Sequence, residues 1–180
     1  MPSSGSLKSA RRCVGLCLCI ALPIVVVIVF WPTIYAFGWH LRYGAESSFK
    51  GKVVPIPLGW TVLSADESKL TLIRQPRSIF SRGPYEFITF QTTVARTSSS
   101  EAFSNWQRSM AFLYKVPEYE VIGPERVDDS AQSFCITIFS ARWKRAGQMS
   151  CWLENGAWQA EFLGKRADMA QFRTLIRAFR

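Results

Sequence analysis

The sequence is poor in the residues that most often carry out catalysis. Only one of its 180 residues is a histidine, His40, which lies at the C-terminal end of an uncharged run. The rest of the chain therefore cannot form a Ser-His-Asp or Cys-His nucleophile system or a histidine-based metal site. Gly-rich phosphate loops and dinucleotide fingerprints are also missing. We accordingly predict no catalytic residues and no metal site.

His40 itself has two interpretations. Imidazole is a common axial ligand, so His40 is a candidate ligand for a haem or a chlorophyll-type pigment near a membrane surface. Alternatively, it is an interfacial residue beside Trp39 and Arg42 that holds a helix end at headgroup depth. We favour the interfacial interpretation and predict no cofactor.

Acidic residues are scarce relative to basic ones. The chain has 22 Lys and Arg against 13 Asp and Glu, which gives a net charge of +9. Lys8, Arg11, Arg12 and Arg42 flank the uncharged run, so 18 basic and 13 acidic residues remain elsewhere. This excess suits anionic lipid or an acidic partner. The sequence has no basic-aromatic motif of the kind that binds nucleic acid, so we predict no such partner.

Residues 13–39 (CVGLCLCIALPIVVVIVFWPTIYAFGW) carry no charge. A membrane span needs about 20 apolar residues, more than the apolar part of a signal peptide, and no small-x-small cleavage site follows. We therefore predict that residues 13–39 form one transmembrane helix, an uncleaved signal anchor, in which Pro23 and Pro32 are tolerated with a kink. Residues 1–12 then form a cytoplasmic tail and residues 40–52 a linker.

The flanking residues predict how this helix is oriented. Trp31, Tyr35 and Trp39 recur every four residues and resemble an aromatic belt at a membrane–water interface. Basic residues before the run favour a cytoplasmic N-terminus, although Arg42 and the lysines after it weaken the contrast. The prediction is a single-pass protein of the cell membrane with its domain in the periplasm or outside the cell.

Only two cysteines lie outside the uncharged run. An oxidising compartment favours a disulfide between Cys135 and Cys151. A tight connection over residues 144–147 would instead place Cys135 opposite Gly156, with Cys151 roughly 15 Å away and out of reach. A disulfide and two free thiols are therefore both open. The cysteines of the run are either small lipid-facing residues or sites of acylation or intermolecular pairing: Cys13, Cys17 and Cys19.

The remainder, residues 53–180, has the size of one α+β domain. Alternating apolar residues and turn signals predict strands at residues 53–63, 69–74, 85–95, 119–122, 133–143, 148–153 and 157–163. Asn155-Gly156 is typical of a two-residue hairpin turn. Apolar stripes at helical spacing predict one helix after the capping box of Ser98 and Glu101 and a second over residues 167–179. We predict an antiparallel sheet of about five to six strands with two packed helices, preceded by one transmembrane helix.

The second of these helices has a one-sided charge distribution. Arg166, Arg173, Arg177 and Arg180, the arginine stripe, cluster within roughly 60° around the helix axis beside its apolar stripe. Only Asp168 offsets them on this helix. The arginine stripe is a candidate interaction surface for anionic headgroups or an acidic partner, and a solvated helix face is the alternative.

Several short motifs resemble the PsbP/Mog1-like α/β domains. They are a Pro-x-Gly-Trp strand entry at Pro57, Gly59 and Trp60, a hairpin, an amphipathic helix, and a Phe-x-Gly sequence at Phe162 before a closing helix. The resemblance covers residues 50–180. It implies an antiparallel sheet flanked by helices and a binding or accessory role. None of the matching positions is a known site residue of the family, and the predicted anchor departs from its soluble or lipid-anchored members.

These patterns predict a membrane-anchored, non-catalytic accessory or assembly subunit whose extracytoplasmic domain binds a larger membrane-protein complex. Its predicted partners are the lipid bilayer and that complex. The alternative is an envelope enzyme or a small-ligand-binding domain with an unrecognised site. A sensor is less favoured, because the predicted cytoplasmic tail is too short to hold an output domain.

Overall fold

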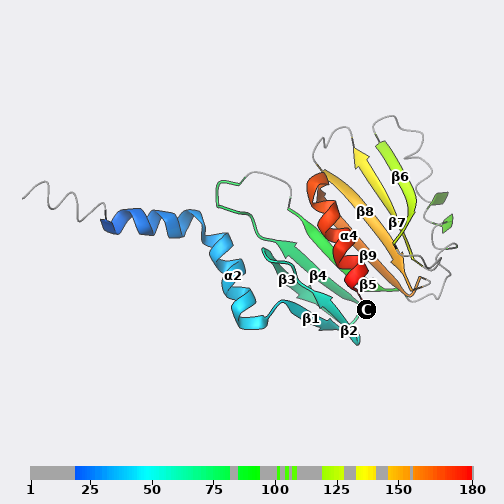
Figure 1. The fold of residues 1–180 in the computed structure, drawn as a ribbon, viewed down its shortest axis with the longest axis horizontal. Coiled ribbons are helices and arrows are strands. Elements are labelled where there is room, and N and C mark those ends of the chain that lie inside the picture. Colours follow the sequence, from blue (N-terminus) through cyan, green and yellow to red (C-terminus); the bar gives the residue numbers. More distant parts are fainter. Residues whose placement is uncertain are drawn as a thin grey trace, which may run out of the picture.

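The computed structural model shows an α+β domain behind two N-terminal helical segments (Figure 1). The predicted α+β class, with an antiparallel sheet and a packed C-terminal helix, is confirmed. The structure describes residues 19–81, 85–93, 101, 104–105, 107–108, 119–127, 133–140, 146–154 and 156–179.

The main sheet has seven strands in the order β3-β4-β5-β9-β8-β7-β6 within the described residues. All neighbouring strands are antiparallel. The last strand, β9, lies between β5 and β8 and so joins the two halves of the sheet. The bounds are β3 Trp60–Ala65, β4 Lys69–Arg74, β5 Phe87–Thr92, β6 Tyr119–Arg126, β7 Phe134–Ser140, β8 Ala146–Leu153 and β9 Trp158–Lys165.

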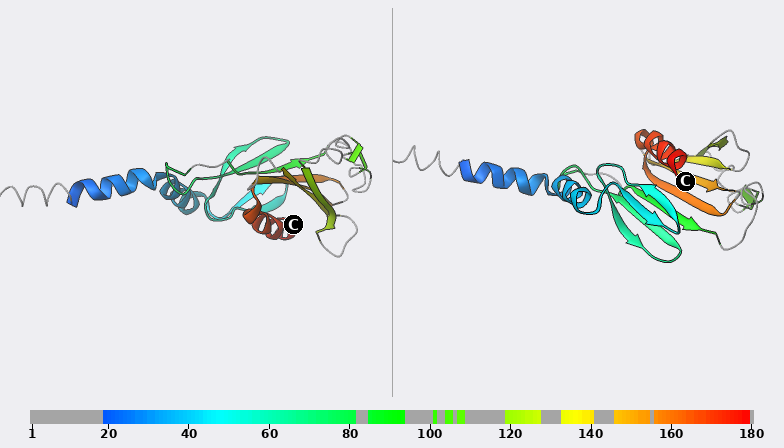
Figure 2. Two further views of the ribbon diagram at one scale, coloured as in Figure 1. Left: turned by 90° about the horizontal axis from the view of Figure 1, so that it is seen from above. Right: turned by 60° about the horizontal axis from the view of Figure 1, so that its bottom comes forward.

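One face of this sheet is covered by a helix and a small hairpin. After the 3-10 turn η3 (Arg166–Asp168), helix α4 (Met169–Ala178) packs on β9 (Figures 1 and 2). The two-stranded sheet β1 (Glu46–Phe49) and β2 (Lys52–Pro55) contacts α4 through β2. The fold therefore buries one continuous layer of side chains between the sheet and these two elements.

The core follows directly from the alternation of the sequence. Leu70 and Leu72 on β4 and Ile88 and Phe90 on β5 point to the same buried face, because successive strand residues alternate. Helix α4 adds its apolar stripe at three- and four-residue spacing. Full burial of each large side chain stabilises the fold by about 1.5–3 kcal/mol.

More of the chain is regular than the sequence predicts. β6 continues through Gly123 to Arg126, beyond the predicted strand 119–122, with a register shift between Ile122 and Glu125. The predicted linker 40–52 instead contains a helix end and strand β1. In these segments apolar and polar residues do not alternate clearly, so the sequence pattern did not indicate strands. The strands form there through backbone hydrogen bonds. Most of the helix predicted after Ser98 lies outside the described residues.

The predicted single transmembrane helix, with a kink tolerated at Pro23 or Pro32, is a bent pair of helices in the structure. Within the described residues the chain forms the helix Cys19–Val29 and helix α2 (Trp31–Tyr43), bent by 71°. No single helix of this part is long and apolar enough to cross a membrane, whereas the bent pair passes on length and composition. Pro32, in the first turn of α2, has no N–H to continue the helix across the break, which accounts for its position.

Candidate functional site

A polar pocket opens where the ends of β4 and β9 meet the loop 75–81 and η3. Its volume is about 540 Å³, within the range of small-molecule sites. The loop supplies one wall, with Gln75, Ser78 and Ile79. The charged residues that line the pocket are Arg74, Arg77, Glu86, Lys165 and Asp168.

Four of these charges form one network around a buried acid. Arg74 Nη1 lies 2.8 Å from Glu86 Oε2 and 2.7 Å from Asp168 Oδ1. Lys165 Nζ lies 3.5 Å from the other oxygen, Oε1, of Glu86. The Glu86 side chain is only 3% exposed, so its negative charge requires these cations to be stable in the interior. The network thereby joins β4, the start of β5, the end of β9 and η3.

The electrostatics of Arg74 suit a structural role. Burial alone would lower the pKa of its guanidinium, but hydrogen bonds to Asp168 and Glu86 outweigh that effect and hold the pKa above its ordinary value. Arg74 is therefore a permanent cation shared by two carboxylates. The exposed Arg77 and the half-exposed Lys165 stand at the same pocket. This arrangement can bind an anionic group, and it contains no nucleophile held against a general base among the described residues.

Sequence reasoning missed this network, although part of its signal was present. Arg74 continues the phase of Leu70 and Leu72, and Glu86 continues that of Ile88 and Phe90. Both charged residues thus lie on the buried face of adjacent strands, where opposite charges are expected to pair. The contribution of Asp168 depends on the return of β9 beside β5, which strand patterns alone do not reveal.

Arg74→Met should lower the free energy of unfolding by about 2 kcal/mol, because it leaves the buried Glu86 without its nearest cation. Urea unfolding of the full chain in detergent micelles would measure this. The double variant Arg74→Met/Glu86→Gln should lose less stability than the sum of the single variants. Strict additivity of the two losses would contradict a direct interaction.

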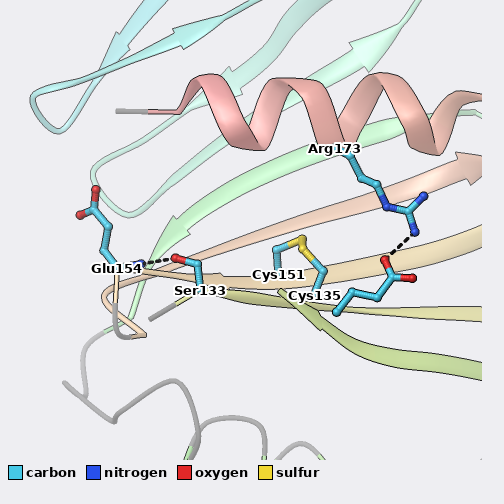
Figure 3. The surroundings of a disulfide bond; sticks show 6 residues. Ser133, Cys135, Cys151, Glu154 and Arg173 are labelled. Carbon is cyan, nitrogen blue, oxygen red and sulfur yellow. Dashed lines mark hydrogen bonds and ion pairs between the residues drawn. A yellow bond between two sulfur atoms is a disulfide. The ribbon is translucent and has the colours of Figure 1, made fainter. Parts of the chain in front are cut away.

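The arginine stripe is only partly available for a partner. The Arg166 guanidinium stacks 4.1 Å from the centre of the Phe139 ring. Arg173 Nη2 pairs with Glu125 Oε2 at 2.8 Å and so joins α4 to β6 (Figure 3). Arg177 is exposed and lines a second pocket, of about 370 Å³, whereas Arg180 lies outside the described residues. Two members therefore help to hold α4 in place, and the interaction role of the stripe stays a prediction.

Cys135 and Cys151 form a disulfide across β7 and β8 (Figure 3). They are directly opposite in the register, with Cα atoms 4.0 Å apart. The register that the tight connection implied is wrong, because Phe139 pairs with Gly147 and the connection lies between Ser140 and Ala146. Both cysteines are buried, at 5% and 0% exposure, so the bond lies within the core beneath α4.

The three residues of the predicted aromatic belt have different surroundings. Trp31 and Tyr35 are 56% and 48% exposed. Trp39 instead packs on the domain core, and its ring lies edge-on to His40. His40 Nε2 is 3.0 Å from the carbonyl oxygen of Trp60. Helix α2 is thus attached to β3 through the two residues that we placed at the membrane boundary.

Metal binding finds no support in the part of the chain that the structure describes. No three His, Cys, Asp or Glu side chains gather there as metal ligands would. Asp66, which precedes Glu67 in the sequence, accepts hydrogen bonds from the backbone N–H of Ser68 and Lys69 at 2.8 Å each. The bonds with Ser68 chiefly lower the pKa of Asp66. This carboxylate therefore stabilises a turn.

Comparison with solved structures finds a similarity of fold. No protein-family model and no curated protein matches the chain. The crystal structure of the Ran-binding protein Mog1p of Saccharomyces cerevisiae is similar, with a TM-score of 0.49 and 11% sequence identity. The match covers 75% of this chain and 93% of Mog1p. This likeness assigns neither a family nor a partner to the chain.

Proposed function

We propose that this protein is a non-catalytic accessory or assembly subunit, attached to a membrane by its N-terminal segment, whose extracytoplasmic domain binds a larger membrane-protein complex. The observation that carries the proposal is the exposed apolar surface of the N-terminal helices. Ile20, Leu22 and Ile24 are 56%, 66% and 52% exposed, and Val25 to Ile28 are similar. A contiguous apolar surface of this kind is stable when lipid or protein covers it.

The disulfide supports the extracytoplasmic side. Disulfides persist in oxidising compartments and are rare in the cytoplasm. Lys8, Arg11 and Arg12 precede the apolar segment and favour a cytoplasmic N-terminus. With one crossing of the membrane, the domain that contains Cys135 and Cys151 lies on the opposite side.

The charged surfaces support binding in preference to catalysis. In the pocket the buried Glu86 is neutralised by Arg74 and Lys165, which leaves exposed Arg77 at the wall. On α4, Arg177 is exposed beside the second pocket. Arginine is well suited to recognise carboxylates on a partner, because its planar guanidinium binds them in a bidentate way.

The pocket favours one second candidate, a domain that binds a small anionic ligand. Its volume of about 540 Å³ would hold such a ligand, with Arg77 as the cation that contacts it. The ligand-binding role and the accessory role can be distinguished by what remains bound to the purified protein. An accessory subunit retains a protein partner, and a ligand-binding domain retains a small molecule.

Accessibility of a surface thiol tests the proposed placement. Ala65, at the exposed end of β3, is changed to Cys in a chain whose Cys13, Cys17 and Cys19 are replaced by Ala. A membrane-impermeant maleimide should label this variant in intact cells, and the protein should stay in the membrane pellet after an alkaline wash. Labelling that requires permeabilised cells would place the domain inside and contradict the proposal.

A further inference from the structure

We infer that the loop Gln75–Ser81 is a second membrane contact, which rests in the headgroup layer of an anionic phospholipid bilayer beside the break between the N-terminal helices. The inference rests on the proposed membrane attachment. It adds that the domain itself touches the lipid and is held in one orientation. We call the exposed residues Trp31, Tyr35, Arg77, Ile79 and Phe80 the break surface.

Two hydrogen bonds fix the position of this loop relative to the end of the first helix. The backbone N–H of Ile79 donates to the carbonyl oxygen of Val29, at the end of the first helix, at 2.9 Å. Thr33 Oγ1 donates to the carbonyl oxygen of Arg77 at 2.7 Å. Figures 1 and 2 both show the loop turning beside the helix break. If the first helix lies in the bilayer, Ile79 therefore lies at the depth of that helix's outer end.

The bend brings α2 and the domain close to the membrane. A helix that enters the bilayer along its normal and turns by 71° continues close to the membrane plane. At 1.5 Å per residue, Cys19–Val29 rises about 16 Å, roughly half of the hydrocarbon thickness. The apolar sequence extends back to Cys13, so the break belongs near the outer boundary of the bilayer.

The chemistry of the break surface matches that boundary. Ile79 and Phe80 are 50% and 72% exposed although both are large apolar residues. Trp31 and Tyr35 belong to the residue types that concentrate at membrane interfaces. Exposed Arg77, which lines the pocket, supplies a positive charge for a lipid phosphate. An anionic bilayer makes favourable contacts with all of these side chains, because its apolar interior lies directly beneath its charged headgroups.

Fluorescence quenching by lipid tests this contact on the full chain. Phe80→Cys, with Cys13, Cys17 and Cys19 replaced by Ala and the native disulfide kept, is labelled with an environment-sensitive fluorophore. The protein is inserted into phosphatidylcholine–phosphatidylglycerol vesicles with or without nitroxide-labelled lipid. Val27→Cys, in the first helix, reports insertion, and Ala65→Cys, at the far end of β3, is the control for exposed domain sites.

The expected result is a blue shift and a loss of fluorescence at residue 80 that approaches the loss at residue 27, with no loss at residue 65. Quenching at residue 27 but not at residue 80 would overturn the lipid contact and leave the membrane attachment intact. The same outcome is expected if the loop binds a protein partner instead of lipid. No quenching at either residue 27 or residue 80 would contradict the attachment itself, and the inference with it.

Discussion

Loss of the Cys135–Cys151 disulfide should lower the free energy of unfolding by about 3 kcal/mol, the value expected for closing a loop of roughly 15 residues. The two cysteines are 16 positions apart. They join β7 to β8 beneath α4, so the bond restricts the unfolded chain and also fixes the register of this hairpin. Chemical denaturation of the Cys135→Ser/Cys151→Ser variant in detergent micelles measures the loss.

Two controls separate this effect from a general effect of cysteine replacement. Cys19 is exposed and unpaired in the described structure, so Cys19→Ser should leave the stability unchanged. A reductant should destabilise the wild-type chain and have no further effect on the double variant. Equal stability of oxidised and reduced wild-type protein would show that the disulfide does not support the fold.

Phe162→Ala should destabilise the domain further, by about 4 kcal/mol, as expected for truncation of a buried Phe. Phe162 is 0% exposed at the centre of the sheet. Its ring stacks on Phe172 of α4 with the centroids 5.5 Å apart, and the centroid of the Trp60 ring is 6.4 Å away. The substitution therefore leaves a cavity where β3, β9 and α4 meet.

The neighbouring Leu163 provides a matched control for this prediction. It lies on the same strand but points to the opposite face and is 40% exposed. Leu163→Ala should therefore cost about 1 kcal/mol or less, since only part of its apolar surface is buried. Both losses are measured by the same unfolding assay. Similar losses for the two variants would contradict the arrangement of the core around Phe162.

Some strands could be located from the sequence because local residue patterns mark them. Lys69–Arg74 was predicted with the bounds that β4 has, because Leu70 and Leu72 alternate with more polar residues. The Asn155-Gly156 signal also gave the correct register, since Leu153 pairs with Trp158 across that turn. At these places the local residue pattern agrees with the tertiary structure, so the sequence alone is enough to locate the strand or the turn.

The register of β7 and β8 could not be predicted in this way. Both faces of β7 pack against apolar neighbours: Cys135 belongs to the core beneath α4, and Ile136 to a second cluster with Trp152. When both faces are apolar, alternation does not select a register. The position of the connection along the chain then decides the pairing, and the side-chain pattern does not reveal that position.

The pocket and the bent helix pair share a different reason for being missed. Each depends on contacts between residues far apart in the sequence, such as Arg74 with Asp168 and Thr33 with Arg77. Composition identified the N-terminal segment as apolar, and Pro32 marked a weak point in it. The packing of α2 on the domain, through His40 and Trp60, is a tertiary property that apolar composition does not reveal.

Purification of the tagged full-length protein from its native membrane in a mild detergent tests the central claim most directly. The co-eluting material is identified by mass spectrometry and by its absorption spectrum, which also reports any pigment or haem near His40. We expect a membrane-protein partner in a fixed ratio to this chain, and we expect less of that partner when Arg177 is changed to Glu. A colourless monomer that retains no protein partner would contradict the accessory role, and a retained small anion would favour the ligand-binding alternative.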